Sequence, residues 1–199
     1  MELADFVLAH DGDDLGKLAL ARERYVAEVK DFDLALTTLE VRRKLREKVP
    51  QWYAIPALRF PLRVSGEQCS STETARYKAA VAAAAAKGCL ADLTGGLGVD
   101  SWAFAQVFDR VLYNEMRPEL ADAARHNFAA LGLSNVTVSC ADSSRENSRL
   151  FWAPSIRTSS SWTRPGADPT DAKSSAWRTV SRTCCNCYRS SWRPVRWSC

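Results

Sequence analysis

Residues 89–108, CLADLTGGLGVDSWAFAQVF, place a short apolar run, a glycine-rich turn and an amphipathic segment in immediate succession. The apolar run Cys89–Thr94 predicts a buried strand, and Asp100–Phe108 predicts a helix. The glycines of the turn allow close approach of a ligand to the backbone, and the following helix start offers N–H groups. The order strand, glycine loop, helix is typical of α/β proteins that bind ligands beyond the carboxyl ends of their strands.

Two further strand patterns follow this unit. Arg110–Glu115 and Asn135–Cys140 both read as short strands, and the segment between them reads as a helix that starts at Pro118 and closes at Gly132. Strands that alternate with helices predict a parallel sheet with right-handed crossovers. The predicted fold class is therefore α/β, with three strands.

The residues before position 89 have helical patterns. Asp13–Val29 and Asp33–Lys48 have helical spacing, and the prolines of residues 50–63 predict an extended connector. Ser70 and Glu73 form a capping box that opens an alanine-rich helix, which Gly88 should end. We expect a small helical region over 1–62 and the N-terminal half of a sheet domain over 63–142.

Overall the chain has 199 residues, 46% apolar and 25% charged, with a net charge of +4, but its last part has a different composition. Residues 1–142 carry 17 basic and 20 acidic residues, whereas 143–199 carry 10 and 3, with five of the seven tryptophans. Four aliphatic side chains, Leu150, Ile156, Val180 and Val195, cannot offset the entropy of ordering so many residues. The composition of residues 143–199 therefore predicts that this segment is either disordered or translated out of frame.

The genetic code favours a lost reading frame. In the shifted frame Trp162–Thr163 must encode Asp, and CCNCY at 184–188 must encode three leucines. Suitable third bases then give a globular sequence that contains LDPARR. We hypothesise that the frame was lost near Glu146–Asn147.

Three acidic residues occupy equivalent places in the predicted sheet. Asp92 lies near the end of the first predicted strand, Glu115 ends the second, and Asp142 follows the third. An acid at the end of the second strand can accept hydrogen bonds from both hydroxyls of a ribose, and one after the third can take an adenine amino group. The loop lacks the first glycine of a dinucleotide fingerprint, and no phosphate-binding loop is present, so a nucleoside such as S-adenosylmethionine fits better than NAD or a triphosphate. A glycine turn that only connects strand to helix is the non-functional alternative.

At these residues the sequence resembles class I S-adenosylmethionine-dependent methyltransferases. The resemblance lies in DLTGGLGVDSWAFA, YNEMRPELADAARHN and LGLSNVTVSCAD, and it is greatest to a bacterial group, largely from Bacteroidetes, with an N-terminal helical region and a C-terminal THUMP-like domain. It covers about 1–142 and implies an incomplete Rossmann-like sheet. By resemblance, the glycine loop shapes the methionine side of the cofactor pocket, Glu115 holds the ribose and Asp142 the adenine. The candidate cofactor-binding residues are Asp92, Thr94, Gly95, Gly96, Gly98, Asp100, Glu115 and Asp142.

In such enzymes a fourth strand ends in an Asp-Pro motif beside the transferred methyl group. Asp168-Pro169 follows no apolar run, whereas the shifted frame supplies the motif as IFLDPARR. We therefore expect this chain to be an inactive or weakly binding fragment of a methyltransferase. The catalytic residues stay unknown.

The resemblance implies RNA as a possible substrate, and the alternative is a non-enzymatic nucleic-acid-binding protein with a basic disordered tail. No apolar run reaches the length of a membrane span, and the acidic N-terminus lacks a signal peptide's pattern, so we expect a cytoplasmic protein without membrane association. The spacing of Cys184, Cys185, Cys187 and Cys199 is not that of a zinc site, so no metal is expected.

Overall fold

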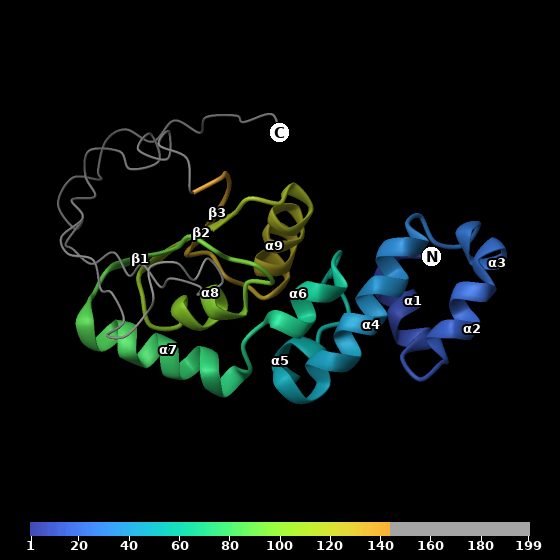
Figure 1. Cartoon of the computed structure of the whole chain (residues 1–199), viewed down its shortest axis with the longest axis horizontal. Coiled ribbons are helices and arrows are strands. Elements are labelled where there is room, and N and C mark those ends of the chain that lie inside the picture. The colour runs from blue at the N-terminus through green and yellow to red at the C-terminus, as the bar shows by residue number, and fades with distance from the viewer. Residues whose placement is uncertain (144–199) are drawn as a thin grey trace, which may run out of the picture.

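A computed structural model describes residues 1–143 of the chain (Figure 1). Its elements, in chain order, are α1 (Leu3–His10), α2 (Leu15–Leu20), α3 (Arg22–Val26), α4 (Phe32–Lys48), α5 (Pro50–Tyr53), α6 (Arg63–Gln68), α7 (Thr72–Ala85), β1 (Cys89–Asp92), α8 (Val99–Phe104), β2 (Arg110–Glu115), α9 (Pro118–Ala130) and β3 (Val136–Cys140). The predictions for residues 144–199, including the lost frame, the basic tail and its cysteines, lie outside the described residues.

The three strands form a parallel sheet in the order β1-β2-β3, which confirms the predicted α/β class. Asp92 pairs with Tyr113, and Glu115 pairs with Cys140. This register brings the ends of β1, β2 and β3 to one edge of the sheet, where the glycine loop begins.

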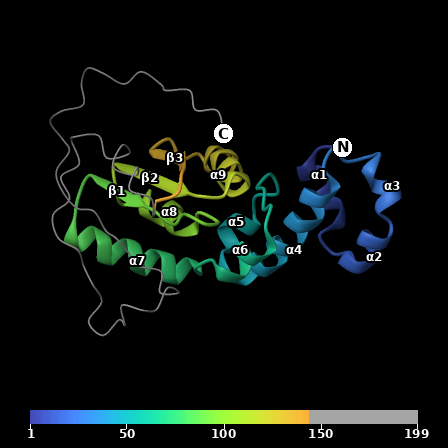
Figure 2. The same cartoon turned by 45° about the horizontal axis from the view of Figure 1, so that its top comes forward.

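Helices cover the sheet in layers. α8 contacts β1 and β2, α9 contacts β2 and β3, and α7 packs against α8. Figure 1 and Figure 2 agree that α8 lies between the sheet and α7. α9 begins with Pro118 at its first position, as the sequence predicts, because a proline there loses no helical hydrogen bond.

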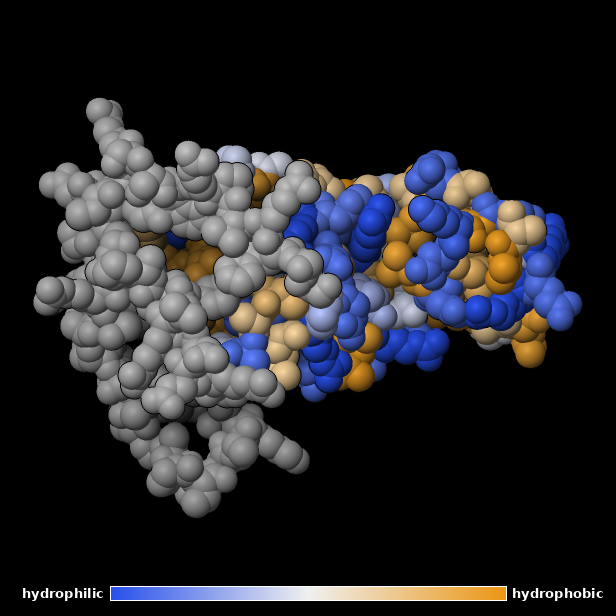
Figure 3. Space-filling view, turned by 90° about the horizontal axis from the view of Figure 1, so that it is seen from above, coloured by the Kyte–Doolittle hydropathy of each residue, from blue (hydrophilic) through white to orange (hydrophobic). Residues whose placement is uncertain are grey.

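Two hydrophobic clusters lie along α4. The smaller one joins α1, α2 and the start of α4 through Phe6, Val7, Leu18, Val29, Phe32, Ala35 and Leu39. The larger begins at Val41 and Leu45 and continues through Trp52 and Phe60 into the sheet. α4 therefore contributes to both cores, and the domain boundary at residue 62 stays a prediction. Over the α1–α3 end, hydrophobic residues on the visible face are interrupted by hydrophilic ones (Figure 3).

Three local predictions were wrong in detail. The helix expected over residues 13–29 is two helices, because Ala21 leaves the helical region with a ψ of 17°. The connector is not extended throughout, since Pro50–Tyr53 forms a helical turn with proline at its start. Ser71, not Ser70, caps α7 by accepting a hydrogen bond from the Thr74 N–H at 3.2 Å. Ser70 is thereby left for a different contact.

Among residues 1–143, every helix is too short or too polar to cross a bilayer.

Candidate functional site

Asp92 organises the start of the glycine loop from inside the fold. Its side chain is buried, with the residue only 7% exposed. One carboxylate oxygen accepts the Ser101 hydroxyl at 2.7 Å, and the other accepts the Thr94 N–H at 3.2 Å. Burial raises the pKa of Asp92, although the hydrogen bond from Ser101 lowers it in part. Asp92 therefore joins the end of β1 to the loop and to α8 at the same time.

The glycine loop is held against Tyr113 of β2. The Gly95 N–H donates to the Asn114 carbonyl at 2.8 Å, and the Tyr113 hydroxyl donates to the Gly96 carbonyl at 2.6 Å. A Cβ on Gly95 would lie 2.2 Å from the Tyr113 ring, so only glycine fits there. Gly96 has a φ of +53° and nothing closer than 3.9 Å to the place of a Cβ. The loop thus packs tightly on its inner side and leaves room beside Gly96, where a ligand could approach.

Glu115 faces this loop. Its Oε2 accepts the Gly96 N–H at 2.9 Å, and its Oε1 accepts the Arg117 N–H at 3.0 Å. A carboxylate has about four acceptor positions, so each oxygen retains capacity for a further donor such as a ribose hydroxyl. The carboxylate is half-buried and already oriented by two backbone groups. Such pre-orientation lowers the entropic cost of binding a diol.

Asn114 fixes the end of β3 beside Glu115. Its Nδ2 donates to the Ala141 carbonyl at 3.0 Å, and the Ala141 N–H donates to the Glu115 carbonyl at 3.1 Å. These bonds hold Asp142, the next residue, half-buried at the same edge as the glycine loop. The Asn114 Oδ1 is buried without a hydrogen-bond partner in the described part of the chain. An unpaired buried acceptor at this edge is suited to a ligand donor.

The remaining predicted residues lie on the glycine loop or in the first turn of α8. Thr94 is exposed on the loop, and Gly98 takes a φ of +95° at the start of α8. Asp100 lies in the first turn of α8, where its Oδ2 contacts Lys78 and Ser70 of the α7 region. The structure therefore brings all eight predicted residues to the carboxyl ends of the three strands, but their roles in binding stay predictions.

Comparison with known proteins found one informative similarity. No protein-family model matches the chain, and no curated protein matches it. The chain is similar to a crystal structure described as a "putative methyltransferase from Porphyromonas gingivalis W83", with a TM-score of 0.58 and 29% sequence identity. The match covers 71% of this chain and 35% of that one, so the chain spans about a third of that protein's length. This similarity is consistent with a partial Rossmann-like methyltransferase fold.

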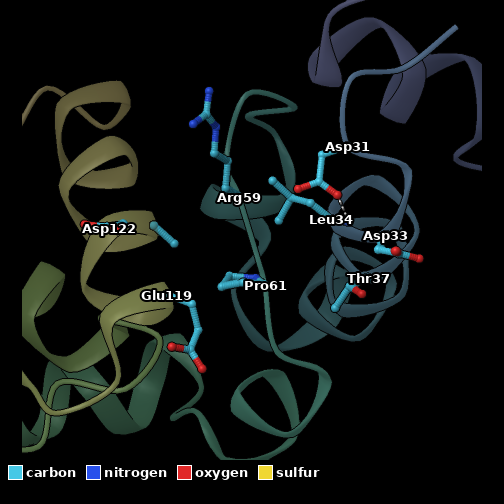
Figure 4. Close-up of a pocket in the computed structure, with 9 residues that line it drawn as sticks. Asp31, Asp33, Leu34, Thr37, Arg59, Pro61, Glu119 and Asp122 are labelled. Atoms are coloured by element: carbon cyan, nitrogen blue, oxygen red, sulfur yellow. Dashed lines mark hydrogen bonds between the residues drawn. The ribbon is translucent and has the colours of Figure 1, made fainter. Parts of the chain in front are cut away.

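A separate hollow of about 400 Å³ lies between α4 and α9 (Figure 4). Its lining is Asp31, Asp33, Leu34, Thr37, Arg59, Pro61, Glu119, Asp122 and Ala123. None of the eight predicted residues belongs to it. Three of its four acids already have partners in the fold, because Asp33 pairs with Arg22, Asp31 caps α4 and Asp122 pairs with Arg125. We therefore assign the candidate site to the glycine loop rather than to this hollow.

The described residues contain no group of three or more His, Cys, Asp or Glu side chains arranged to hold a metal ion.

Sequence reasoning missed the residues that support the site. Tyr113, Asn114 and Ser101 read as ordinary strand and helix residues, yet they brace the loop and its acids. An asparagine in the apolar strand pattern was the one available signal, because a buried amide needs hydrogen-bond partners.

Proposed function

We propose that this chain is the cofactor-binding part of an S-adenosylmethionine-dependent methyltransferase. The observation that supports this most directly is the convergence of Glu115 with the glycine loop through the 2.9 Å bond from the Gly96 N–H. An acid at the end of β2, beside a glycine loop that follows β1, suits a nucleoside whose ribose faces the acid. The similarity to the Porphyromonas gingivalis protein supports the same assignment.

Each part of the edge has a distinct proposed role. Glu115 would hold the ribose, Asp142 with Asn114 would contact the adenine, and Asp92 would keep the glycine loop in place beneath the methionine. When bound, S-adenosylmethionine supplies a methyl group on a sulfonium that is open to attack by a nucleophile. The protein contributes orientation and exclusion of water, which supply much of the rate in such reactions.

The finer parts of the proposal rest on the resemblance of residues 1–142 to the THUMP-like group. We propose RNA as the methyl acceptor, the cytoplasm as the location, and a parent protein whose further strands follow in the shifted reading frame. The 199-residue chain should bind the cofactor weakly and transfer no methyl group, because its described residues supply three strands of the sheet and no Asp-Pro motif at a strand end.

Calorimetric titration of the full chain with S-adenosylhomocysteine tests the proposal. We expect measurable binding that falls about tenfold or more in Glu115→Gln, because a neutral amide offers weaker and fewer acceptors to the two ribose hydroxyls. The exposed Glu119→Gln is a matched control near the start of α9 and should bind like wild type. An absence of binding in wild type, or an unchanged affinity in Glu115→Gln, would refute the assignment. Salt-sensitive RNA binding without nucleoside binding would instead favour a nucleic-acid-binding protein.

A further inference from the structure

Three consecutive residues at the end of β2 hold the glycine loop. The Tyr113 hydroxyl donates to the Gly96 carbonyl at 2.6 Å, and the Glu115 Oε2 accepts the Gly96 N–H at 2.9 Å. Between them in sequence, the Asn114 carbonyl accepts the Gly95 N–H at 2.8 Å. The two backbone polar groups of Gly96 are therefore bound by two different side chains of the same strand.

Hydrogen bonds, and not packing, determine the orientation of Gly96. The residue is half-buried, and a Cβ built on it would have no neighbour closer than 3.9 Å. Its φ of +53° belongs to the wide range that glycine alone adopts readily. A bond to its carbonyl limits rotation about its backbone bonds, and this keeps its N–H directed at Glu115. The hydroxyl of Tyr113 supplies that bond.

Tyr113 is suited to act as a fixed donor. Its ring is fully buried, and its edge packs on Phe128 at 5.4 Å between centroids. Burial raises the pKa of Tyr113, and the nearby negative charges of Glu115 and Asp92 raise it further. The hydroxyl therefore stays protonated at any ordinary pH. A phenol whose ring cannot move has one direction in which to donate, and the Gly96 carbonyl lies there.

We propose that Tyr113 is a positioning residue for ribose recognition, and that it acts through Gly96 on the carboxylate of Glu115. The hydroxyl fixes Gly96, and the Gly96 N–H then fixes one carboxylate oxygen. The ribose hydroxyls meet a carboxylate whose orientation is set before binding, which lowers the entropic cost. Tyr113 itself does not touch the nucleoside. This inference rests on the proposed function and adds the origin of its selectivity for ribose.

Two ligands that differ by one hydroxyl test the inference. They are S-adenosylhomocysteine and its 2′-deoxyribose analogue, titrated calorimetrically into the full chain. Wild type should bind the ribose form at least about tenfold more tightly, as one hydrogen bond to a carboxylate predicts. Tyr113→Phe removes the hydroxyl and keeps the ring. It should reduce this ratio to about threefold or less, mainly through weaker binding of the ribose form.

A double substitution separates positioning from general support of the fold. In a Glu115→Gln background, Tyr113→Phe should change the affinity for S-adenosylhomocysteine by less than about twofold, because the carboxylate through which it acts is gone. Tyr53→Phe is the matched control. It also removes the hydroxyl of a half-buried tyrosine, one that bonds Asp11 in the N-terminal helical region. It should change neither affinity nor their ratio.

Amide hydrogen exchange measures the same coupling without a ligand. In Tyr113→Phe the Gly96 amide should exchange at least about tenfold faster than in wild type, whereas the Gly95 amide, bonded to Asn114, should change little. Urea unfolding shows whether Tyr113→Phe folds. If it does not, the wild-type chain still carries the test, because an unprotected Gly96 amide or equal binding of the two nucleosides would overturn the inference.

Two results with the variants would overturn the inference while the proposed function stands. A parallel fall in both affinities in Tyr113→Phe, with the ratio unchanged, would indicate that the hydroxyl only supports the fold. An equally large loss with and without the Glu115 carboxylate would indicate that Tyr113 does not act through it. Failure of the wild-type chain to bind S-adenosylhomocysteine at all would instead refute the proposed function, and the inference with it.

Discussion

Gly95 offers the sharpest test of how the loop is built. Replacement by alanine places a Cβ 2.2 Å from one carbon of the Tyr113 ring and 2.5 Å from two more. Ordinary carbon contacts lie at about 3.5–4.0 Å, so the ring or the loop must move by more than an ångström. The ring has little freedom, since Tyr113 is fully buried, its hydroxyl bonds the Gly96 carbonyl, and its edge packs on Phe128 at 5.4 Å between centroids.

We expect Gly95→Ala to lower the free energy of unfolding by about 3 kcal/mol, at the upper end of typical overpacking costs. Gly96→Ala is the matched comparison, because its Cβ meets nothing closer than 3.9 Å and its cost comes from the φ of +53° alone. That cost should be about 1–2 kcal/mol. Urea unfolding of the full chain, followed by helical circular dichroism, measures both values.

A second substitution makes the cause explicit. In a Tyr113→Val background the ring is gone, so adding the Gly95→Ala methyl should cost less than about 1 kcal/mol. The backbone at Gly95 is not left-handed, which leaves no conformational penalty to confuse the comparison. If Gly95→Ala costs no more than Gly96→Ala, or if its cost persists without the ring, then contact with Tyr113 is not what requires glycine at this position.

Three further outcomes follow from the same structure. Burial raises the pKa of Asp92, so the native state binds a proton at Asp92 more readily than the unfolded state does. Wild type should therefore lose stability relative to Asp92→Asn as the pH rises from about 4 through that raised pKa. A difference in urea midpoints that does not change with pH would contradict this. The side-chain amide of Asn127 accepts the Arg59 N–H at 2.8 Å and donates to the Arg59 carbonyl at 2.9 Å. Asn127→Ala should therefore lower the free energy of unfolding by about 1–3 kcal/mol in the same urea assay. A loss below about 0.5 kcal/mol would show that other contacts hold the connector. A gene with its frame restored near Glu146 should yield a protein that transfers methyl groups to RNA from radiolabelled S-adenosylmethionine, and an alternative frame interrupted by stop codons would refute the lost-frame hypothesis.

The sheet could be predicted from sequence because its strands are short, apolar and bounded by strong signals. Arg110–Glu115 is a strand from its first predicted residue to its last, and Pro118 starts α9 as expected. Once the strands are parallel, their carboxyl ends must share an edge. The positions of Asp92 and Glu115 at that edge follow from the pattern alone.

The N-terminal helices were harder to predict, because their stability depends on contacts distant in sequence. α1 was not predicted, and its Phe6 is fully buried against Tyr25 and Phe32. Helices this short are marginal in isolation, so packing decides whether they form. The sequence pattern of eight residues carries little of that information.

The contact between Lys78 and Asp100 illustrates the same limit at the candidate site. Lys78 and Asp100 are 22 positions apart and belong to different helices. Only the packing of α7 on α8 brings them together, and no spacing rule connects them. Likewise the ring nitrogen of His126 in α9 bonds the Ala57 carbonyl at 2.9 Å and helps hold the connector, although the two residues are 69 positions apart.

The hydrogen bonds that hold the glycine loop matter for nucleoside binding more than for methyl transfer. Tyr113, Asn114 and Ser101 all lie between Asp92 and Ala141, so the geometry of the glycine loop and Glu115 depends on groups within one short segment. Nucleoside binding should therefore tolerate the loss of later strands better than methyl transfer, which also needs an acceptor held in line with the sulfonium. Within residues 1–143, β1 and β3 each pair with β2 alone, so both outer edges of the sheet are open to a further strand of the proposed parent protein. Restoration of the frame should consequently raise methyl transfer from none to a measurable rate, while the proportional loss of S-adenosylhomocysteine affinity caused by Glu115→Gln should stay about the same, because the groups that hold Glu115 are already present.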